Sequence, residues 1–432
     1  MISETTNTMN SSGSQYLFIE SQLMDRSSHH TEYLKCILDG AKQKNIDTHV
    51  VCNRSATADI KRAFAASAVL ASVSGKELDG IGGKFKRHFV KLSNTARNSV
   101  AIFHQLRKAR KRVAIVVPTA WTLEIFALLP SLIWFRRKIQ SANLIFIPQL
   151  KSTELESKKT KLLSVLARAA NWVHPRIRFF AETKVAREAF AKITNCEFKP
   201  IAHPIYFETT FDEKAAKTRT PQAVNRTDTP VIFGCYGFAR YEQGIDVLQA
   251  ALNELLDRNP DLNIHVFIKW SKPFAMPDGS VAAPDAHLES TGKVTFIKEV
   301  LSDAPYYQQL RKTDCIVFPY RPESYAARMS RVFLEACCLG IPTIVSKGTN
   351  QWNISSKLQA GIGVAAEDPA ALAHAIESMA AGISGYREKA KAVSALSRRM
   401  FSPVQFWQDI QETGWENELV TAKPIIEASQ AQ

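Results

Sequence analysis

Several sequence features that would assign a location or a cofactor are missing from this chain of 432 residues. The first fifteen residues are polar and lack the basic start and apolar run of a secretory signal. No apolar stretch approaches the roughly 20 residues of a transmembrane helix, and no internal repeat is visible. We therefore expect a cytoplasmic protein without a membrane span.

The seven cysteines form no C-x-x-C pair and no spacing typical of metal ligands. Four of them lie within apolar runs, at positions 235, 315, 337 and 338. Reduced cysteines in a protein core are typical of a reducing compartment. We expect no disulfide, no metal ion and no cofactor.

Acidic residues are scarce in one segment of the N-terminal half. Between Lys76 and Lys138 there are fourteen Lys and Arg residues and three acidic residues, a balance of +11 within a net charge of +14. Such a segment favours a polyanion or an anionic membrane surface, although a solvated basic surface is the simpler alternative. The apolar run Ile125–Phe135 within it suits either an interfacial segment or a buried core helix. We expect peripheral docking on the inner face of a membrane.

Nucleic-acid binding is another function that a basic segment suggests. Phe85, Phe89 and Phe103 lie among the charges, as base-stacking residues would, but no recognised nucleic-acid module surrounds them. We expect no nucleic-acid partner.

The composition is that of a soluble globular protein, with 45% hydrophobic and 22% charged residues. At this length two α/β domains are expected, because a single core rarely grows so large. Short apolar segments alternate with helical ones, which is the pattern of parallel sheets. In the N-terminal half the predicted strands are residues 16–19, 47–52, 112–117, 143–147 and 179–181, with helices at 30–44 and 184–194.

Residues 209–229 are polar without clear periodicity, and we interpret them as a linker. They separate an N-terminal domain, residues 15–208, from a C-terminal domain, residues 230–400, and residues 1–14 form a tail. The strands predicted in the second domain are 231–234, 263–268, 294–297, 315–318 and 343–345, and helices follow them. Within residues 401–432 we expect a last helix, packing back on the N-terminal domain, and a tail.

Three groups of residues in the C-terminal half follow strand ends, where doubly wound sheets bind ligands. The first is FGCYGFARYEQG, residues 233–244. Gly237 would let the backbone approach a phosphate, and Arg240 supplies a cation ahead of a helix N-terminus. An ordinary turn glycine is the alternative at Gly237. Lys269, directly after a strand, is a further candidate for contact with an anion.

The second group is SRVFLEACCLG, residues 330–340, a predicted helix that begins at Ser330. Arg331 places a cation in its first turn, where it opposes the helix dipole unless an anion binds there. Arg328 lies one turn earlier. Glu335 offers two acceptor oxygens to the paired hydroxyls of a ribose, and an i,i+4 salt bridge with Arg331 is the alternative.

The third group is CIVFPYRPE, residues 315–323, whose loop is expected to bring Arg321 and Glu323 to the rim of the site. The order of the three groups resembles the donor domain of retaining glycosyltransferase family 4, the glycosyl transferases group 1, over about residues 230–380. The resemblance implies the GT-B fold, in which two Rossmann-like doubly wound domains face a central cleft. It also implies that Glu335 binds the nucleotide ribose.

The resemblance implies transfer of a sugar, with retention of configuration and without an essential metal ion, from a nucleotide-diphosphate sugar. The acceptor would be a glycan or a lipid-linked molecule, as in polysaccharide or glycoconjugate synthesis. Arg240, Arg328 and Arg331 would stabilise the charge of the leaving diphosphate. His30 in the N-terminal domain is a candidate for acceptor activation, with a surface or helix-capping histidine as the alternative.

Three positions depart from the pattern of that family. Ala327 stands where the first glutamate of an E-x7-E pair is expected, and Glu323 is the nearest acid. Gln243 replaces a lysine before Gly244, and Arg331 replaces a small residue. A GT-B-shaped binding or scaffold protein that has lost catalysis is therefore the alternative to an active enzyme.

Overall fold

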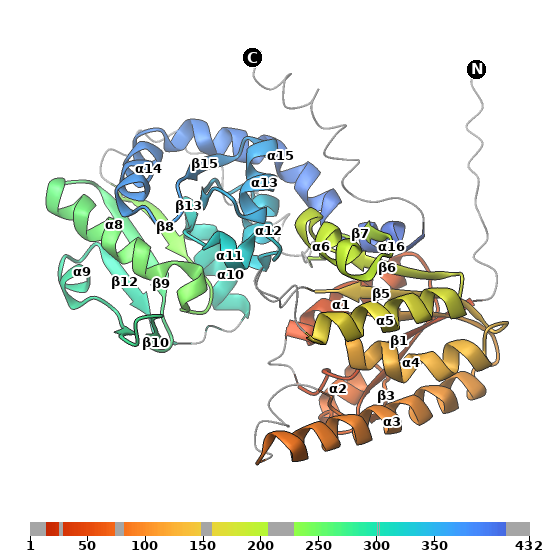
Figure 1. The fold of residues 1–432 in the computed structure, drawn as a ribbon. Coiled ribbons are helices and arrows are strands. Elements are labelled where there is room, and N and C mark those ends of the chain that lie inside the picture. The colour runs from red at the N-terminus through yellow and green to blue at the C-terminus, as the bar shows by residue number, and fades with distance from the viewer. Residues whose placement is uncertain are drawn as a thin grey trace, which may run out of the picture. The chain divides into compact units, whose positions relative to one another are not determined.

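A computed structural model describes residues 14–25, 29–73, 82–147, 158–205, 229–299, 301 and 303–411. These residues form two units, each built on a parallel sheet (Figure 1). The chain passes from the first unit to the second at Pro204–Ile205 and returns to the first at Ser402–Pro403. Residues 1–13 of the predicted tail (1–14) and residues 209–228 of the predicted linker (209–229) lie outside the described residues, and Ser14 belongs to the first strand.

The first unit contains a sheet of seven parallel strands in the order β3-β2-β1-β4-β5-β6-β7. Its strands are β1 (Ser14–Glu20), β2 (Thr48–Asn53), β3 (Ser67–Leu70), β4 (Arg112–Val117), β5 (Ile139–Phe146), β6 (Ile177–Ala181) and β7 (Phe198–Pro200). Its helices are α1 (His29–Gln43), α2 (Ala58–Ala63), α3 (Lys84–Lys108), α4 (Thr122–Trp134), α5 (Lys158–Val173), α6 (Lys184–Thr194) and α16 (Pro403–Gln411).

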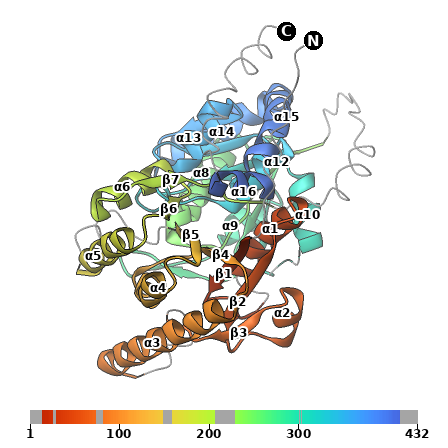
Figure 2. The same ribbon diagram turned by 90° about the vertical axis from the view of Figure 1, so that its right-hand side faces the viewer.

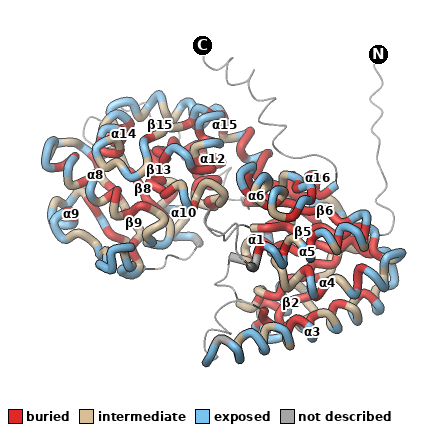
Figure 3. The backbone as a smooth tube through the Cα atoms, viewed as in Figure 1, coloured by how far each residue is buried: buried red, intermediate tan, exposed pale blue. Residues whose placement is uncertain are grey.

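The helices of the first unit cover both faces of its sheet. Right-handed crossovers place α1 and α2 on one face, and α3, α4, α5 and α6 side by side on the other (Figures 1 and 2). Buried apolar side chains from β1, β2, β4 and β5 form the centre of this unit, as the burial colours in Figure 3 show. The strands are buried on both faces, which explains why they read as continuous apolar runs in the sequence.

Helix α16, near the C-terminal end of the described chain, packs against α1 in the first unit. The indole Nε1 of Trp407 donates a hydrogen bond to the carbonyl oxygen of Ile37 at 2.8 Å. A Cβ on Gly40 would lie 2.4 Å from the carbonyl oxygen of Pro403, so only glycine allows this approach of α16. Asp409 accepts a hydrogen bond from the backbone N–H of Ala202 at 2.7 Å, which ties α16 to the segment after β7.

The second unit contains a sheet of six parallel strands in the order β12-β9-β8-β13-β14-β15, and a short antiparallel pair, β10-β11. Its strands are β8 (Val231–Cys235), β9 (Ile264–Lys269), β10 (Phe274–Ala275), β11 (Val281–Ala282), β12 (Val294–Ile297), β13 (Cys315–Phe318), β14 (Thr343–Ser346) and β15 (Gly361–Val364). Its helices are η3 (Tyr241–Gln243), α8 (Ile245–Arg258), α9 (Ala286–Ser290), α10 (Asp303–Lys312), α11 (Pro322–Tyr325), α12 (Arg331–Leu339), α13 (Asn350–Leu358), α14 (Pro369–Ala381) and α15 (Ile383–Met400).

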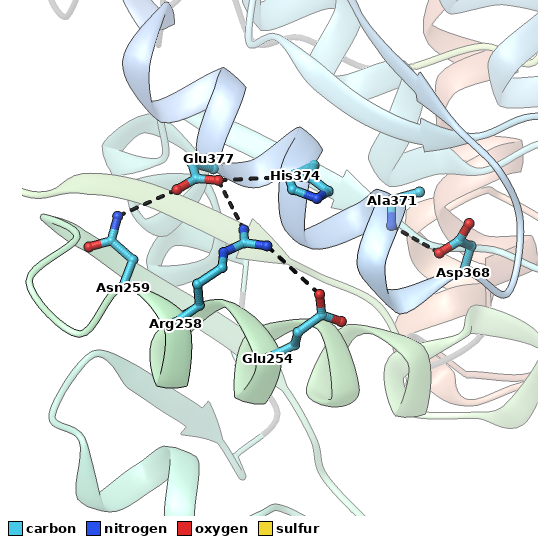
Figure 4. Close-up of polar contacts among 7 residues, drawn as sticks. All are labelled: Glu254, Arg258, Asn259, Asp368, Ala371, His374 and Glu377. Carbon is cyan, nitrogen blue, oxygen red and sulfur yellow. Dashed lines mark hydrogen bonds and ion pairs between the residues drawn. The ribbon is translucent and has the colours of Figure 1, made fainter.

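Polar contacts at the surface of the second unit join α8 to α14 (Figure 4). Arg258 forms ion pairs with Glu377 at 2.9 Å and with Glu254 at 3.9 Å. Asn259 also donates to Glu377, at 3.4 Å. At the other end of α14, Asp368 caps the helix by accepting from the backbone N–H of Ala371 at 2.9 Å. The polar side chains drawn in Figure 4 therefore have partners within the second unit.

The predicted fold class, α/β with two doubly wound parallel sheets, is confirmed. The apolar run Ile125–Phe135 lies mostly in α4, and its residues divide between core and surface. Ile125, Leu128 and Leu132 are buried, whereas Phe126, Ile133 and Trp134 are exposed. The buried side fits the interpretation as a core helix, and the interfacial interpretation stays a prediction for the exposed side.

Candidate functional site

The sheet of the second unit changes direction between β8 and β13. From β8 the chain continues outward through β9 and β12, whereas β13, β14 and β15 extend the sheet on the other side. Ligands of doubly wound proteins bind beyond the carboxyl ends of the strands at such a switch point. The residues that follow β8, β9 and β13 therefore make up the candidate site.

The turn after β8 depends on Gly244, which ends the helix η3 and begins α8. Gly244 has a φ of +63°, and a Cβ there would lie 1.9 Å from the carbonyl oxygen of Pro319. The absence of a side chain lets the start of α8 touch the loop that follows β13. The amide of Gln243 fills the space beside Gly237, where a Cβ would lie 2.9 Å from Nε2. The first and third sequence groups are thus in direct contact.

Two predicted anion-binding residues, Arg240 and Lys269, flank the ring of Phe238. The Cζ atom of Arg240 lies 5.5 Å from the ring centroid, and Nζ of Lys269 lies 4.9 Å from it. Burial lowers the pKa of the Lys269 ammonium. Two cations near one ring repel each other in the absence of an anion, so an anionic ligand would relieve that repulsion.

Tyr325, on the short helix α11, lies near both Arg240 and Arg328. Its hydroxyl accepts a hydrogen bond from Nε2 of Gln243 at 3.3 Å. Burial raises the pKa of Tyr325, while this hydrogen bond and the charges of Arg328 and Arg240 act to lower it. Arg240 and Arg328, predicted from separate sequence groups, therefore act on one hydroxyl.

Ser330 is the N-cap of helix α12, so the helix begins where the sequence predicted. Its hydroxyl accepts a hydrogen bond from the backbone N–H of Phe333 at 3.4 Å and lies 3.4 Å from the Tyr320 hydroxyl. Ser330 is buried, and its oxygen serves as the N-cap of α12. Arg331 follows in the first turn, which contains no acidic residue.

Glu335 is enclosed by three hydrogen-bond donors. Its carboxylate accepts from Tyr306 Oη at 2.6 Å, from Tyr307 Oη at 3.2 Å and from Arg331 Nε at 3.0 Å, and only 1% of the residue is exposed. The i,i+4 salt bridge, which the sequence left open as an alternative role, is therefore formed. Burial and the charge of Glu335 raise the pKa of Tyr306, which keeps this tyrosine protonated and donating. Both tyrosines lie on α10, which carries no recognisable site motif.

Arg321 is not at the rim of the site, where its loop was expected to bring it. Its side chain is 8% exposed, with a bidentate contact to Asp246 at 3.0 and 2.7 Å and a further bond to Glu367 at 2.7 Å. Its guanidinium also lies 3.7 Å from the ring centroid of Tyr241. Arg321 thus fixes the loop after β13 to η3 and α8. Glu323 is exposed on α11 and forms no hydrogen bond or ion pair with any of the residues that the structure describes.

In the first unit, His30 lies at the carboxyl edge of the sheet beside Glu20, the last residue of β1. Its Nδ1 atom is 3.6 Å from the carboxylate of Glu20, which also accepts from the Thr119 hydroxyl at 2.8 Å. Burial lowers the pKa of His30, but the charge and hydrogen bond of Glu20 outweigh burial and leave it raised from 6.5. The sequence analysis did not name Glu20 as a site residue, although its position at the end of a strand could have indicated one.

Two more carboxyl groups lie at strand or helix ends in the first unit. Burial raises the pKa of Glu124, in the first turn of α4, from 4.5 to about 7. Glu182, directly after β6, lies 2.7 Å from Nδ1 of His203 and is almost fully buried. Among the described residues, no three His, Cys, Asp or Glu side chains are grouped as ligands for a metal ion.

Comparison with known protein families gives a match within the second unit. Residues 230–381 match the family described as Glycosyl transferases group 1. This range contains the six-stranded sheet and every residue of the candidate site in the second unit. No curated protein sequence matches the chain.

Solved structures resemble the fold of both units. HepE from Anabaena, in complex with UDP, aligns with a TM-score of 0.57 at 15% identity, covering 92% of this chain and 98% of its own. A glycosyltransferase from Rickettsia africae aligns with a TM-score of 0.56 at 10% identity over 96% and 99% of the two chains. Sucrose-phosphate synthase from Thermosynechococcus elongatus gives 0.56 at 13% identity, with coverage of 96% and 99%. The fold of the described chain is therefore of the GT-B class.

Proposed function

We propose, from the glycosyl transferases group 1 domain at residues 230–381, that this protein transfers a sugar from a nucleotide-diphosphate sugar to an acceptor. The transfer retains the anomeric configuration of the donor. The acceptor is a glycan or a lipid-linked molecule, and the product belongs to polysaccharide or glycoconjugate synthesis in the cytoplasm. The observation that carries the proposal is the pair of cations around Phe238 at the switch point of the donor-domain sheet.

The donor diphosphate lies at the turn after β8, in contact with Arg240 and Lys269. Arg240 follows the end of β8, and Lys269 is the last residue of β9. Arg328 adds a third positive charge near Tyr325. As the glycosidic bond to the diphosphate breaks, negative charge grows on the leaving oxygen. Preplaced cations and backbone N–H groups stabilise that charge without rearranging, which is the largest contribution available to such a site. We assign this role to side chains of the protein instead of a metal ion.

Glu335 binds a hydroxyl of the donor ribose. A carboxylate has about four acceptor positions, and three are used by Tyr306, Tyr307 and Arg331. Because Glu335 is buried, the ribose reaches it only when Arg331 or Tyr306 moves aside. Arg331 then becomes available to the diphosphate at the N-terminus of α12, where an anion is favoured.

The acceptor binds at the carboxyl edge of the first sheet, near His30. Glu20 holds the ring of His30 through Nδ1, and the side chain keeps 30% of its surface exposed. A histidine held in this way can take a proton from an acceptor hydroxyl, because Glu20 outweighs burial and raises the pKa of the imidazole from 6.5, which makes it a stronger base.

A binding or scaffold protein without catalytic activity is the second candidate. The observation that favours it is the ion pair of Arg331 with Glu335, which uses the carboxylate that is proposed to bind the ribose. Gln243, in place of a lysine, contacts Tyr325 instead of pointing to an open site. The two candidates differ in whether donor is consumed.

Calorimetric titration with nucleotide sugars tests the donor site. HepE, which is similar in fold, is described in complex with UDP-glucose, so uridine-diphosphate sugars are the first donors to try. Arg240→Ala should weaken donor binding by about 1.5–3 kcal/mol, the range for hydrogen bonds to charged groups. Glu335→Gln should weaken it similarly, provided that circular dichroism shows a folded protein. Lys357→Ala, at an exposed lysine on α13 of the same unit, is the matched control.

Unchanged donor affinity in both variants would remove the assignment of the donor site. Binding of donor by the wild type, without release of nucleoside diphosphate in the presence of any acceptor, would favour the scaffold protein.

A further inference from the structure

Exposed apolar side chains are concentrated on three helices of the first unit. Of the fourteen large hydrophobic side chains that are exposed among the described residues, ten lie on α3, α4 and α5. These helices pack side by side on one face of the sheet (Figures 1 and 2). Single exposed apolar residues are normal in soluble proteins, whereas a gathering on neighbouring elements marks an interaction surface.

The first half of helix α3 exposes apolar side chains, and the side chains that face the core in its middle turns are polar. Phe85, Phe89 and Leu92, spaced by four and three residues, share one side of the helix and are 87%, 67% and 58% exposed. On the inner side, Asn98 bonds the backbone of Ala71 through both its amide atoms, at 2.7 and 2.9 Å. Asn94 donates to the carbonyl oxygen of Ser72 at 2.8 Å. The outer stripe therefore contributes nothing to the core of this unit.

Helices α4 and α5 continue this surface with tryptophans. Trp134 at the end of α4 is 74% exposed, and Trp172 near the end of α5 is 85% exposed. The ring of Phe103 on α3 lies 6.0 Å from that of Trp134, which joins the two helices at this end. Tryptophan is enriched where an apolar region meets water, because its ring is apolar and its N–H is polar.

The charges on these helices are almost all positive. The sequences of α3 and α5 contain no Asp or Glu, and α4 contains only Glu124. Exposed basic residues lie among the aromatic ones, at Lys86 and Arg107 on α3 and at Arg136 and Arg137 after α4. Lys138 joins these groups, since its Nζ donates to the carbonyl oxygen of Arg107 at 3.5 Å.

We propose that the outer sides of α3, α4 and α5, here called the α3–α5 surface, dock on an anionic lipid bilayer. The apolar stripe enters the boundary between headgroups and acyl chains, and the surrounding Lys and Arg side chains contact lipid phosphates. A second copy of the chain would bring like charges together, and a nucleic acid would leave the leucine, valine and isoleucine side chains without apolar partners. None of the described helices is long and apolar enough to cross a bilayer, so the contact is a peripheral one. The proposed docking would stand even if the protein did not transfer a sugar.

Vesicle flotation tests the proposal with the full-length protein. Vesicles of phosphatidylcholine alone are compared with vesicles that also contain phosphatidylglycerol, at about 0.1 M and 1 M salt, where the Debye length is roughly 10 Å and 3 Å. The wild type should bind the anionic vesicles at low salt, much less at high salt, and the neutral vesicles weakly. The emission of the exposed Trp134 and Trp172 should shift to shorter wavelength on binding.

Two sets of variants separate the apolar and the charged contributions. Phe85→Gln with Phe89→Gln should lower the affinity for anionic vesicles at least tenfold. Arg136→Gln with Arg137→Gln should lower it about 25-fold, because each basic residue near an anionic surface contributes about fivefold. The control carries Val281→Gln and Lys357→Gln, at exposed positions of the second unit, and should bind as the wild type does.

Two results would overturn the proposal. One is that the wild type does not bind anionic vesicles, or that the variants of the α3–α5 surface bind them as well as the control does. The other comes from sedimentation velocity. A wild type that sediments as a dimer, with the Phe85/Phe89 variant as a monomer, would show that a second copy covers this surface.

Discussion

Glu124 is a carboxyl group held where its charged form is disfavoured. Burial raises its pKa from 4.5 to about 7, and the charge of Glu20 acts in the same direction. The folded state therefore keeps a proton on Glu124 that the unfolded chain loses above about pH 4.5. The stability linked to this group is complete below pH 4.5 and is lost as the pH rises to about 7.

Replacing Glu124 with Gln should remove this pH dependence. Gln resembles the protonated carboxyl, so the variant and the wild type should be about equally stable at pH 5. At pH 8 the variant should be more stable by about 3 kcal/mol, from the size of the pKa shift. Urea unfolding at both pH values measures the difference. A free-energy difference that is the same at pH 5 and pH 8 would show that the pKa of Glu124 is not raised.

Three arginines near the donor site show which properties of a single residue the sequence indicates and which it does not. Arg240 is exposed above the ring of Phe238, where it could contact an anion. Arg331 forms the salt bridge with Glu335 that the sequence offered as an alternative. Arg321, expected at the rim, is buried between two carboxylates. Its partners Asp246 and Glu367 are far from it in the chain, and their approach depends on the packing of the sheet. The sequence indicates where each positive charge lies along the chain, but it does not indicate whether the side chain is buried.

At the scale of elements, the turn between β8 and α8 depends on close contact of two backbones. Gly244→Ala should destabilise the second unit strongly, because its Cβ would lie 1.9 Å from the carbonyl oxygen of Pro319 and its φ is +63°. The matched control is Gly279→Ala, which has a φ of +87° and no atom within 4 Å of the added Cβ. The control should cost about 1–2 kcal/mol of backbone strain alone, and Gly244→Ala clearly more.

Thermal unfolding of both variants measures this contrast. If the two substitutions lower the midpoint equally, the close approach of Gly244 to Pro319 contributes nothing beyond its φ angle. In the expected case, Gly244→Ala also weakens donor binding, since it moves the turn that carries Arg240.

The elements that could be predicted are those with a strong local pattern. Strands β4 and β13 are apolar runs followed by a proline, and both were found within a residue or two of their ends. Helices α3 and α5 were not predicted. The first half of α3 buries asparagine and threonine and exposes aromatic residues, and α5 exposes a tryptophan, although both helices also bury leucine side chains. A pattern that expects apolar residues inside and polar residues outside fails on such helices. The reversed pattern of α3 is the feature that the proposed bilayer contact explains.

At the scale of the whole molecule, the two units carry different chemistry. The first unit holds the basic α3–α5 surface and a group of carboxyl and histidine residues at its sheet edge. The second holds the cations of the proposed donor site and the match to glycosyl transferases group 1. Most of the net charge of +14 comes from residues 76–138, with a balance of +11, and therefore belongs to the first unit. The charge of this segment pointed to an anionic partner, and the structure added that exposed apolar side chains lie on the same helices.

The most direct test of sugar transfer is phosphorus NMR of a nucleotide sugar incubated with the protein and a lipid extract as acceptor. With a suitable donor, the wild type should release nucleoside diphosphate at a rate that rises with enzyme concentration. The double variant Arg240→Ala, Arg328→Ala should release almost none, because both cations near Tyr325 are gone. Lys357→Ala should behave as the wild type does. Intact donor after incubation with a folded wild type across a panel of nucleotide sugars, or equal release by the double variant, would contradict the assignment of this protein as a glycosyltransferase that uses this site.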